Sequence, residues 1–137
     1  MSKEYKKPLP EKKAYTEEFW KATKQHKLLI QECKDCKSKI FYPRKFCPEC
    51  WSPNLGWSQA SGKAKVYTYT ITMGMVESKF VADLPYVLAM VTLEEGIRMM
   101  TRIVGCDPAT VKIGMDVEVV FEDVNEEFTL PYFRPSK

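Results

Sequence analysis

The sequence has few features of membrane or secreted proteins. Its longest apolar run, from Tyr86 to Val91, is far shorter than the about 20 residues that a membrane-spanning helix needs. The Lys-rich start MSKEYKKPLPEKK contains no apolar stretch of the kind found in signal peptides. We therefore expect a cytoplasmic protein with no membrane partner. Hydrophobic residues make up 45% of the chain, which is enough to form the core of a folded domain.

The sequence also lacks a convincing catalytic set. Cys106 follows an apolar strand, where an inert buried thiol is expected and a nucleophile is the alternative. The single histidine, His26, is distant in sequence and is expected to cap a helix C-terminus rather than act as a base. The acidic residues occur as adjacent pairs whose side chains diverge, as on a solvated surface: Glu17–Glu18, Glu94–Glu95 and Glu126–Glu127.

Charge is distributed unevenly along the chain. Residues 1–50 carry 13 Lys and Arg against 7 Asp and Glu, a net +6, and residues 51–137 carry 8 against 11, a net −3. These values add to the total of +3. One Zn²⁺ bound by four thiolates would lower the first segment to +4, so the basic character is modest.

Four of the five cysteines lie in the stretch CKDCKSKIFYPRKFCPEC. The spacing C-x2-C-x10-C-x2-C lets two tight turns direct four thiolates at one ion, and small buried cysteines are the alternative. Thiols stay reduced in the cytoplasm, and a tetrahedral S₄ site suits zinc, with iron as the second choice. Four cysteines fill the coordination shell, so we predict a structural metal. The ligands are Cys33, Cys36, Cys47 and Cys50.

Periodicity predicts one helix followed by a series of strands. The helix begins at Thr16 as the N-cap, ends near His26 and has Phe19, Trp20 and Thr23 on one side. Residues 27–33 and 39–47 are predicted as the two strands of a ribbon hairpin, and residues 51–62 as a linker. Five further strands are expected at 63–73, 86–93, 97–104, 112–124 and 127–135.

The order of these strands is that of a five-stranded oligonucleotide/oligosaccharide-binding (OB) barrel. Asp107 and Pro108 predict about one helical turn between its third and fourth strands. Pro131 restricts the last strand to an edge position, because proline has no N–H to donate. A different small β-barrel is the alternative.

The stretches CKDCKSKIFYPRKFCPEC, GKAKVYTYTIT, FVADLPYVLAMVTLEEGIRMMTRIVG and VKIGMDVEVVFED, in this order, resemble the acyl-CoA-associated OB-fold proteins with an N-terminal rubredoxin-like zinc ribbon. This family was long classed as a domain of unknown function, and the resemblance covers about residues 15–124. In zinc ribbons of this kind, a glycine often follows the second cysteine of each Cys-x-x-Cys pair. This chain has Lys37 and Trp51 there. A glycine at such a position indicates a positive φ, so some strain or a different turn is expected in this chain.

The fold expected from pattern and resemblance together is mainly β. It has a flexible basic N-terminus and helix (1–27), a rubredoxin-like zinc ribbon and linker (28–60) and a five-stranded OB-fold barrel (61–137). The resemblance implies a non-catalytic accessory subunit in lipid metabolism. Its partner would be a thiolase-like enzyme or another enzyme acting on acyl-CoA, such as a hydratase or aldolase, and the subunit would help to form the CoA channel.

The loop FVADLPY after the first barrel strand lies where OB folds present their variable binding loops. Phe80, Pro85 and Tyr86 are candidates to contact the pantetheine arm of CoA or acyl-CoA, or a partner protein. Lys79 would then face a phosphate. The alternative is that Phe80 and Tyr86 only close the end of the barrel.

Single-stranded nucleic-acid binding is the competing function. It is favoured by Tyr67, Tyr69, Lys63 and Lys65 on one strand, which combine stacking and positive charge. The net −3 of the barrel segment argues against it, because a groove that follows a phosphate backbone should be basic. A stand-alone enzyme using Cys106 is the third and weakest hypothesis.

Overall fold

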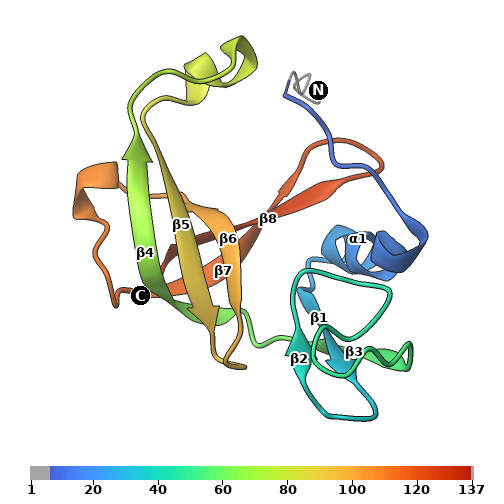
Figure 1. Cartoon of the computed structure of the whole chain (residues 1–137). Coiled ribbons are helices and arrows are strands. Elements are labelled where there is room, and N and C mark those ends of the chain that lie inside the picture. The colour runs from blue at the N-terminus through green and yellow to red at the C-terminus, as the bar shows by residue number, and fades with distance from the viewer. Residues whose placement is uncertain (1–6, 137) are drawn as a thin grey trace.

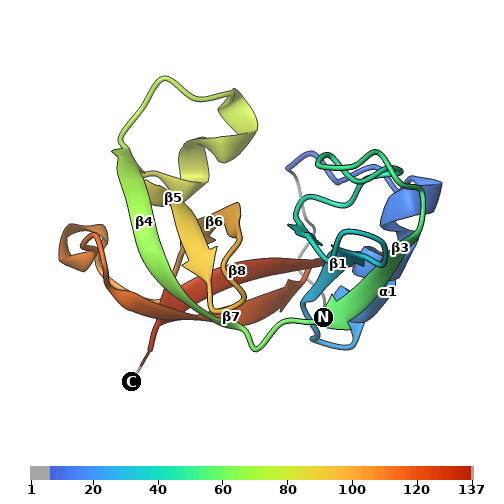
Figure 2. The ribbon, with the colours of Figure 1, turned by 60° about the horizontal axis from the view of Figure 1, so that its bottom comes forward.

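The computed structural model of the protein describes residues 7–136, which form a ribbon module and a barrel module (Figure 1). The ribbon module lies beside the barrel, and a short link between them crosses from one to the other (Figure 2). Within residues 7–136, no helix is both long enough and apolar enough to span a bilayer.

A short helical segment opens the ribbon module. It comprises the 3₁₀ turn η1 (Ala14–Thr16) and helix α1 (Glu17–Lys24), whose acidic first turn and basic last turn suit the helix dipole. Its apolar side is buried, with Phe19 5% exposed, as predicted. The Thr16 hydroxyl does not cap the helix, because it bonds to the backbone N–H and carbonyl of Lys13.

The ribbon itself is a three-stranded antiparallel sheet in the order β2-β1-β3. Its strands are β1 (Leu29–Cys33), β2 (Lys39–Ile40) and β3 (Leu55–Gln59). The prediction that residues 51–62 form only a linker was wrong, because they contain β3. This strand pairs with β1 from Leu29↔Gln59 to Cys33↔Leu55, since the second cysteine turn brings the chain back to the free edge of β1. The returning strand is also shorter than predicted and ends at Ile40, before Pro43.

The second module is a closed five-stranded barrel in the order β4-β5-β6-β8-β7, which confirms the OB fold. Its strands are β4 (Lys63–Thr72), β5 (Tyr86–Leu93), β6 (Arg98–Ile103), β7 (Asp116–Asp123) and β8 (Thr129–Pro135). Between β6 and β7 lies the predicted single turn, η3 (Pro108–Thr110), where the Asp107 carboxylate accepts a hydrogen bond from the Ala109 N–H (3.0 Å). A second 3₁₀ segment, η2 (Ser78–Asp83), lies between β4 and β5.

Few backbone pairs join β6 and β8, the two strands that close the barrel. The two strands share one ladder position, Ile103↔Phe133, whereas β7 and β8 are paired over the whole of β8. Pro131 faces Phe121 on β7 and lies outside the ladder with β6. The prediction that the last strand lies at an edge was therefore wrong, because β8 pairs with both β7 and β6. At Pro131 itself, β8 has no ladder partner on the β6 side, so the missing N–H of proline interrupts no pairing there.

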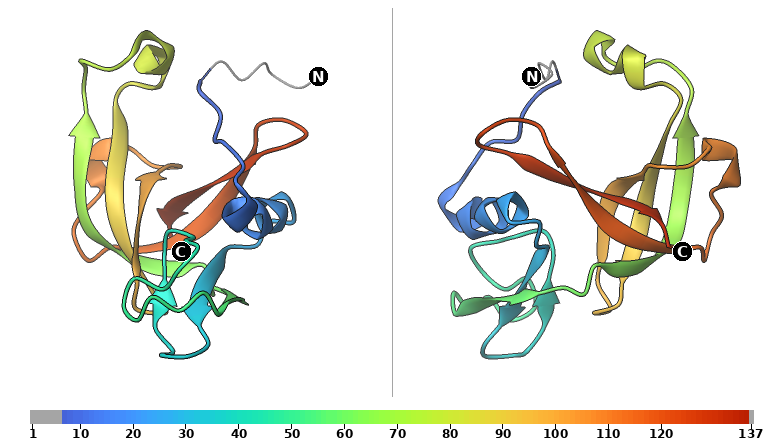
Figure 3. Two further views of the ribbon diagram at one scale, coloured as in Figure 1. Left: turned by 45° about the vertical axis from the view of Figure 1, so that its right-hand side comes forward. Right: turned by 180° about the vertical axis from the view of Figure 1, so that it is seen from behind.

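The two modules share one hydrophobic core. Phe19, Leu28 and Ile30 of the ribbon module belong to the same buried cluster as Val91 and Phe133 of the barrel. Helix α1 packs between the ribbon sheet and the β7–β8 hairpin, which reaches over it in both views of Figure 3. A second and much smaller cluster lies at the cysteines and contains Cys33, Ile40 and Cys47 with Leu55 against them.

Candidate metal centre and adjoining groove

Two turns of matching backbone geometry hold the four predicted metal ligands. In the first, the Lys37 N–H donates to the Cys33 carbonyl (2.9 Å), and in the second the Trp51 N–H donates to the Cys47 carbonyl (2.8 Å). Lys37 and Trp51 both have φ of 64°, so the residues that replace glycine adopt the left-handed conformation and keep the turn.

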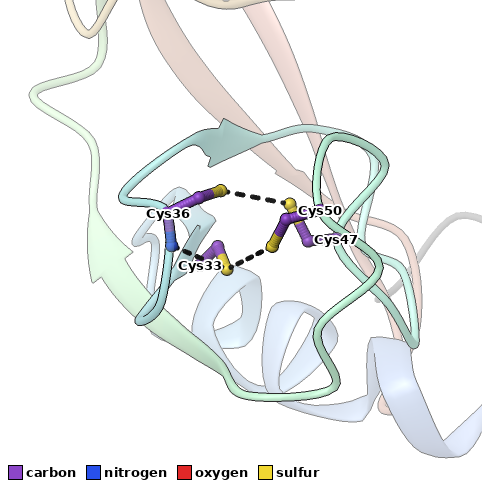
Figure 4. Close-up of side chains that lie close together, drawn as sticks. All are labelled: Cys33, Cys36, Cys47 and Cys50. Carbon is purple, nitrogen blue, oxygen red and sulfur yellow. Dashed lines mark hydrogen bonds between the residues drawn. The ribbon is translucent and has the colours of Figure 1, made fainter.

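The turns direct all four sulfurs at one point, as Figure 4 shows. The sulfur atoms lie within 4.8 Å of one another, with Cys36 to Cys47 at 3.5 Å and Cys33 to Cys50 at 3.6 Å. The Cys36 N–H donates to the Cys33 sulfur and the Glu49 N–H to the Cys47 sulfur, each at 3.4 Å. This donor set fits one tetrahedral ion such as zinc.

The four thiols influence one another's ionisation. Hydrogen bonding at Ser38, whose hydroxyl oxygen lies 3.2 Å from the Cys36 sulfur, lowers the pKa of Cys36 to about 6. At Cys50 the backbone N–H of Ser52 acts to lower the pKa, but desolvation and the other three thiols outweigh it and raise the pKa to about 12. Four adjacent thiolates repel one another, so full ionisation of this cluster requires a cation among them.

The loop residues proposed from the sequence surround an ion-paired arginine. Arg102 of β6 lies with its guanidinium carbon 4.0 Å from the centre of the Tyr86 ring and 5.8 Å from that of Phe80. Lys79 and Pro85 are exposed on the same loop. The structure therefore brings Phe80 and Tyr86 together around Arg102, while Lys79 and Pro85 lie at the surface.

The loop is held by a contact that was not predicted from the sequence, and we call it the arm–loop contact. Asp83 of η2 accepts hydrogen bonds from Lys7 (2.6 Å) and from Arg102 (2.9 Å). Partial burial acts to raise the pKa of Asp83, but its two cationic partners outweigh burial and lower the pKa. No sequence pattern pairs these residues, because Lys7 lies in a segment without helix or strand.

Three other sequence hypotheses can be placed in the structure. His26 ends the helix through its backbone, which has φ of 58° and donates from its N–H to the Thr23 carbonyl (2.9 Å). Its ring does not contact the helix end but lies 3.2 Å from the Asp123 carboxylate and stacks on Phe121. Cys106 packs partly buried against the main core. Tyr67, suggested for nucleic-acid stacking, is 50% exposed and lies under Arg98, whose guanidinium carbon is 3.8 Å from the ring centre.

A groove lies between the modules, where β6 and β8 diverge. It has a volume of about 610 Å³ and is lined by residues from the segment 11–16, α1, the ribbon turn at 41–43, β6 and β8, and by Leu88 of β5. The Tyr42 hydroxyl accepts a hydrogen bond from the Met100 N–H of β6 (2.8 Å), which links the ribbon to this strand of the barrel. Arg102 lies at the wall of the groove and links it to the loop of Phe80 and Tyr86.

Comparison with known families matches both modules. Residues 20–56 match the family described as "ChsH2, rubredoxin-like zinc ribbon domain", and residues 57–122 match that described as "ChsH2, C-terminal OB-fold domain". The solved chain titled "Ltp2-ChsH2(DUF35) aldolase" superposes with a TM-score of 0.82 and 35% identity over 93% of this chain and 98% of that chain. The resemblance found in the sequence is confirmed.

Two curated relatives are also similar to the chain. A "DUF35 domain-containing scaffold protein" of Methanocaldococcus jannaschii is 39% identical over 110 residues, which are 79% of this chain and 77% of that protein. A "Probable enoyl-CoA hydratase alpha subunit" of Thermomonospora curvata is 39% identical over 119 residues, or 86% of this chain. The match spans 37% of that longer subunit.

Proposed function

Because the chain belongs to the DUF35 family, which joins a rubredoxin-like zinc ribbon to an OB-fold domain, we propose that it is a non-catalytic accessory subunit of an enzyme acting on acyl-CoA. The observation that carries this proposal is the match over nearly the whole length of the DUF35 chain named with an aldolase. Relatives named as scaffold proteins and as a hydratase alpha subunit support the same role.

The partner in this proposal is a thiolase-like enzyme or another cytoplasmic enzyme of acyl-CoA metabolism. The surface offers groups suited to such a contact. Trp51 is 76% exposed and Phe46 49% exposed, both beside the second cysteine turn. Aromatic residues of this kind are the usual anchors of protein interfaces.

In this proposal the metal is zinc, with iron as the alternative, and its role is structural. Bound by Cys33, Cys36, Cys47 and Cys50, zinc would supply four bonds that hold the two turns together. The small cluster around the cysteines buries few side chains, so this end of the ribbon has little other packing to hold it.

The chain is also proposed to contribute to the CoA channel of its partner. Phe80 and Tyr86 would contact the pantetheine arm beside Arg102, with Pro85 at the rim and Lys79 toward a phosphate. The exposed position of Lys79 leaves its ammonium accessible to such a ligand.

Co-expression tests the proposed function. The chain is produced with the acyl-CoA enzymes encoded beside it, and co-elution and turnover are measured with and without it. We expect one enzyme to co-elute and to gain activity or stability. Trp51→Ala should weaken the complex, whereas Ile113→Ala, at another exposed apolar residue on the barrel, should not.

Failure of every enzyme to co-elute or change in rate would refute the accessory role. Nucleic-acid binding is then decided by titrating single-stranded oligonucleotides at increasing salt, because phosphate contacts weaken steeply with salt. Strong, salt-sensitive binding that falls in a Tyr67→Ala variant would establish that alternative in its place.

A further inference from the structure

The groove between the modules opens into a second cavity of opposite character. This cavity, which we call the cationic pocket, has a volume of about 650 Å³ and is lined by Lys13, Arg44 and Lys45 with Tyr15 and Tyr42. The two cavities share Lys13, Tyr15, Tyr42 and Pro43 in their walls, so they are contiguous. A largely apolar groove therefore adjoins a pocket lined by three positively charged side chains.

The cations of the pocket have no carboxylate among its described lining residues. Of residues 7–136, no acidic residue lines the pocket, and Glu11 is the one carboxylate that lines the groove. Within residues 7–136, none of Lys13, Arg44 and Lys45 forms an ion pair. Unpaired cations in a concave site attract an anionic ligand.

The pocket is held in place by a buried side chain. Gln31 is 4% exposed, and its amide donates to the Arg44 carbonyl (3.0 Å) while accepting from the Arg44 N–H (2.7 Å). Lys45 lies over the Tyr15 ring, with its nitrogen 5.6 Å from the ring centre. These contacts hold the backbone of Arg44 and the side chain of Lys45 before any ligand arrives, which lowers the entropic cost of binding.

The groove has the opposite chemistry. Phe19 and Trp20 of α1, Phe41 of the ribbon, and Leu88 and Met100 of the barrel contribute apolar surface to it. At its far side Arg102 is already engaged by Asp83. A ligand that matches both cavities has a phosphorylated head and a long, largely uncharged arm.

We propose that these two cavities form one binding site for an acyl-CoA-type thioester, with the phosphates at Lys13, Arg44 and Lys45 and the pantetheine and acyl arm in the groove. This inference rests on the proposed function for the class of ligand, and on the charges and the shared walls for its position. The phosphorylated head is thus placed on the ribbon module, and this position replaces the one at Lys79 in the channel proposed above. The arm then runs toward Arg102 and the loop of Phe80 and Tyr86.

Calorimetric titration of the isolated chain with octanoyl-CoA tests the site. The double variant Arg44→Ala/Lys45→Ala should weaken binding about tenfold or more, because charge-assisted contacts to phosphate are lost. The matched control, Lys27→Ala/Lys34→Ala, removes the same charge from exposed positions that line neither cavity and should bind normally.

Partial ligands separate the two halves of the site. Adenosine bisphosphate should lose affinity in the Arg44→Ala/Lys45→Ala variant, and octanoyl-pantetheine should lose it in Met100→Glu, which places a charge in the groove. Ile113→Glu, at an exposed residue outside the groove, is the control. Tight binding of adenosine bisphosphate with none of octanoyl-pantetheine would overturn the proposal in favour of a nucleotide site.

Two other results would also overturn the proposed site. One is that the wild-type chain does not bind octanoyl-CoA, and the other is that Arg44→Ala/Lys45→Ala and Lys27→Ala/Lys34→Ala lose the same affinity for it. The outcome is independent of the co-expression test. A chain that co-elutes with an enzyme but binds octanoyl-CoA equally well after Arg44→Ala/Lys45→Ala refutes the site alone. A chain that binds as expected but never co-elutes supports the site and refutes the accessory role.

Discussion

The cysteines and one buried glutamine determine the local shape of the ribbon. Cys33 and Cys47 are fully buried, whereas Cys36 and Cys50 are exposed, so each turn contributes one inner and one outer sulfur. Gln31 holds the backbone of the following turn through both ends of its amide. Single substitutions at these residues should therefore have effects well beyond the side chain that is changed.

Cys47→Ser should abolish metal binding and unfold the end of the ribbon, because one buried ligand is lost from a complete set. Elemental analysis of natively purified protein measures the metal, and near-ultraviolet circular dichroism measures the fold around the ribbon aromatics. Cys106→Ala is the control. It should keep full metal content and partner activity and cost about 1 kcal/mol of stability from lost packing. Loss of metal from Cys47→Ser with an unchanged ribbon would show that the ion is not structural.

Gln31→Leu should destabilise the chain by about 1–3 kcal/mol, because the N–H and carbonyl of Arg44 lose their buried partner. Denaturant unfolding measures this change in free energy. Gln59→Leu, at the exposed end of β3, should leave stability nearly unaltered. Equal stability of the two variants would mean that water replaces the Gln31 amide without cost.

At the scale of elements, the arm–loop contact joins three segments that are far apart in the sequence. Lys7 comes from the N-terminal segment, Asp83 from η2 and Arg102 from β6. The groups are largely shielded, with side-chain exposures of 17%, 27% and 16%. This contact holds the β4–β5 loop against β6 at the wall of the groove.

Asp83→Asn should loosen this loop, and its effect should depend on pH. The pKa of Asp83 is lowered in the folded chain, so its contribution is fully present above the unfolded pKa and is lost as pH falls through the folded pKa. Thermal unfolding should show the wild type more stable by about 1 kcal/mol at neutral pH, with the difference disappearing in acid. Asp116→Asn, in a well-exposed ion pair with Lys65, serves as the control. A difference that persists unchanged in acid would contradict the charge-based explanation.

At the scale of the whole molecule, the two ends of the ribbon are stabilised by different hydrophobic clusters. Its inner side, with Leu28 and Ile30, belongs to the core that it shares with the barrel, whereas its cysteine end rests on a cluster of three buried residues. Loss of metal should therefore affect the two ends of the ribbon differently.

Removal of the metal with a chelator should expose the amides of residues 33–54 to rapid hydrogen exchange while the barrel strands stay protected. The shared core does not depend on the ion, whereas the cysteine end does. Hydrogen exchange read by mass spectrometry, before and after chelation and after zinc is restored, measures this. Uniform loss of protection across β4–β8 would show instead that the modules unfold as one unit.

Local patterns were sufficient for much of this protein. The Cys-x-x-Cys spacing, the five barrel strands and the single turn at Asp107 were all predictable, because each depends on neighbours within a few residues. The side-chain contacts of His26 were not predictable, because its partners Asp123 and Phe121 lie on β7.

Sequence alone thus predicted the cysteine cluster and the succession of the barrel strands along the chain, since ligand spacing and strand periodicity are properties of short segments. The ordered series of motifs also indicated the family. The pairing of β3 with β1, the arm–loop contact and the groove that opens into the cationic pocket emerged only from the tertiary structure. Each of these joins segments that are remote along the chain, and periodicity encodes which face of a strand is buried but not which distant segment lies against it.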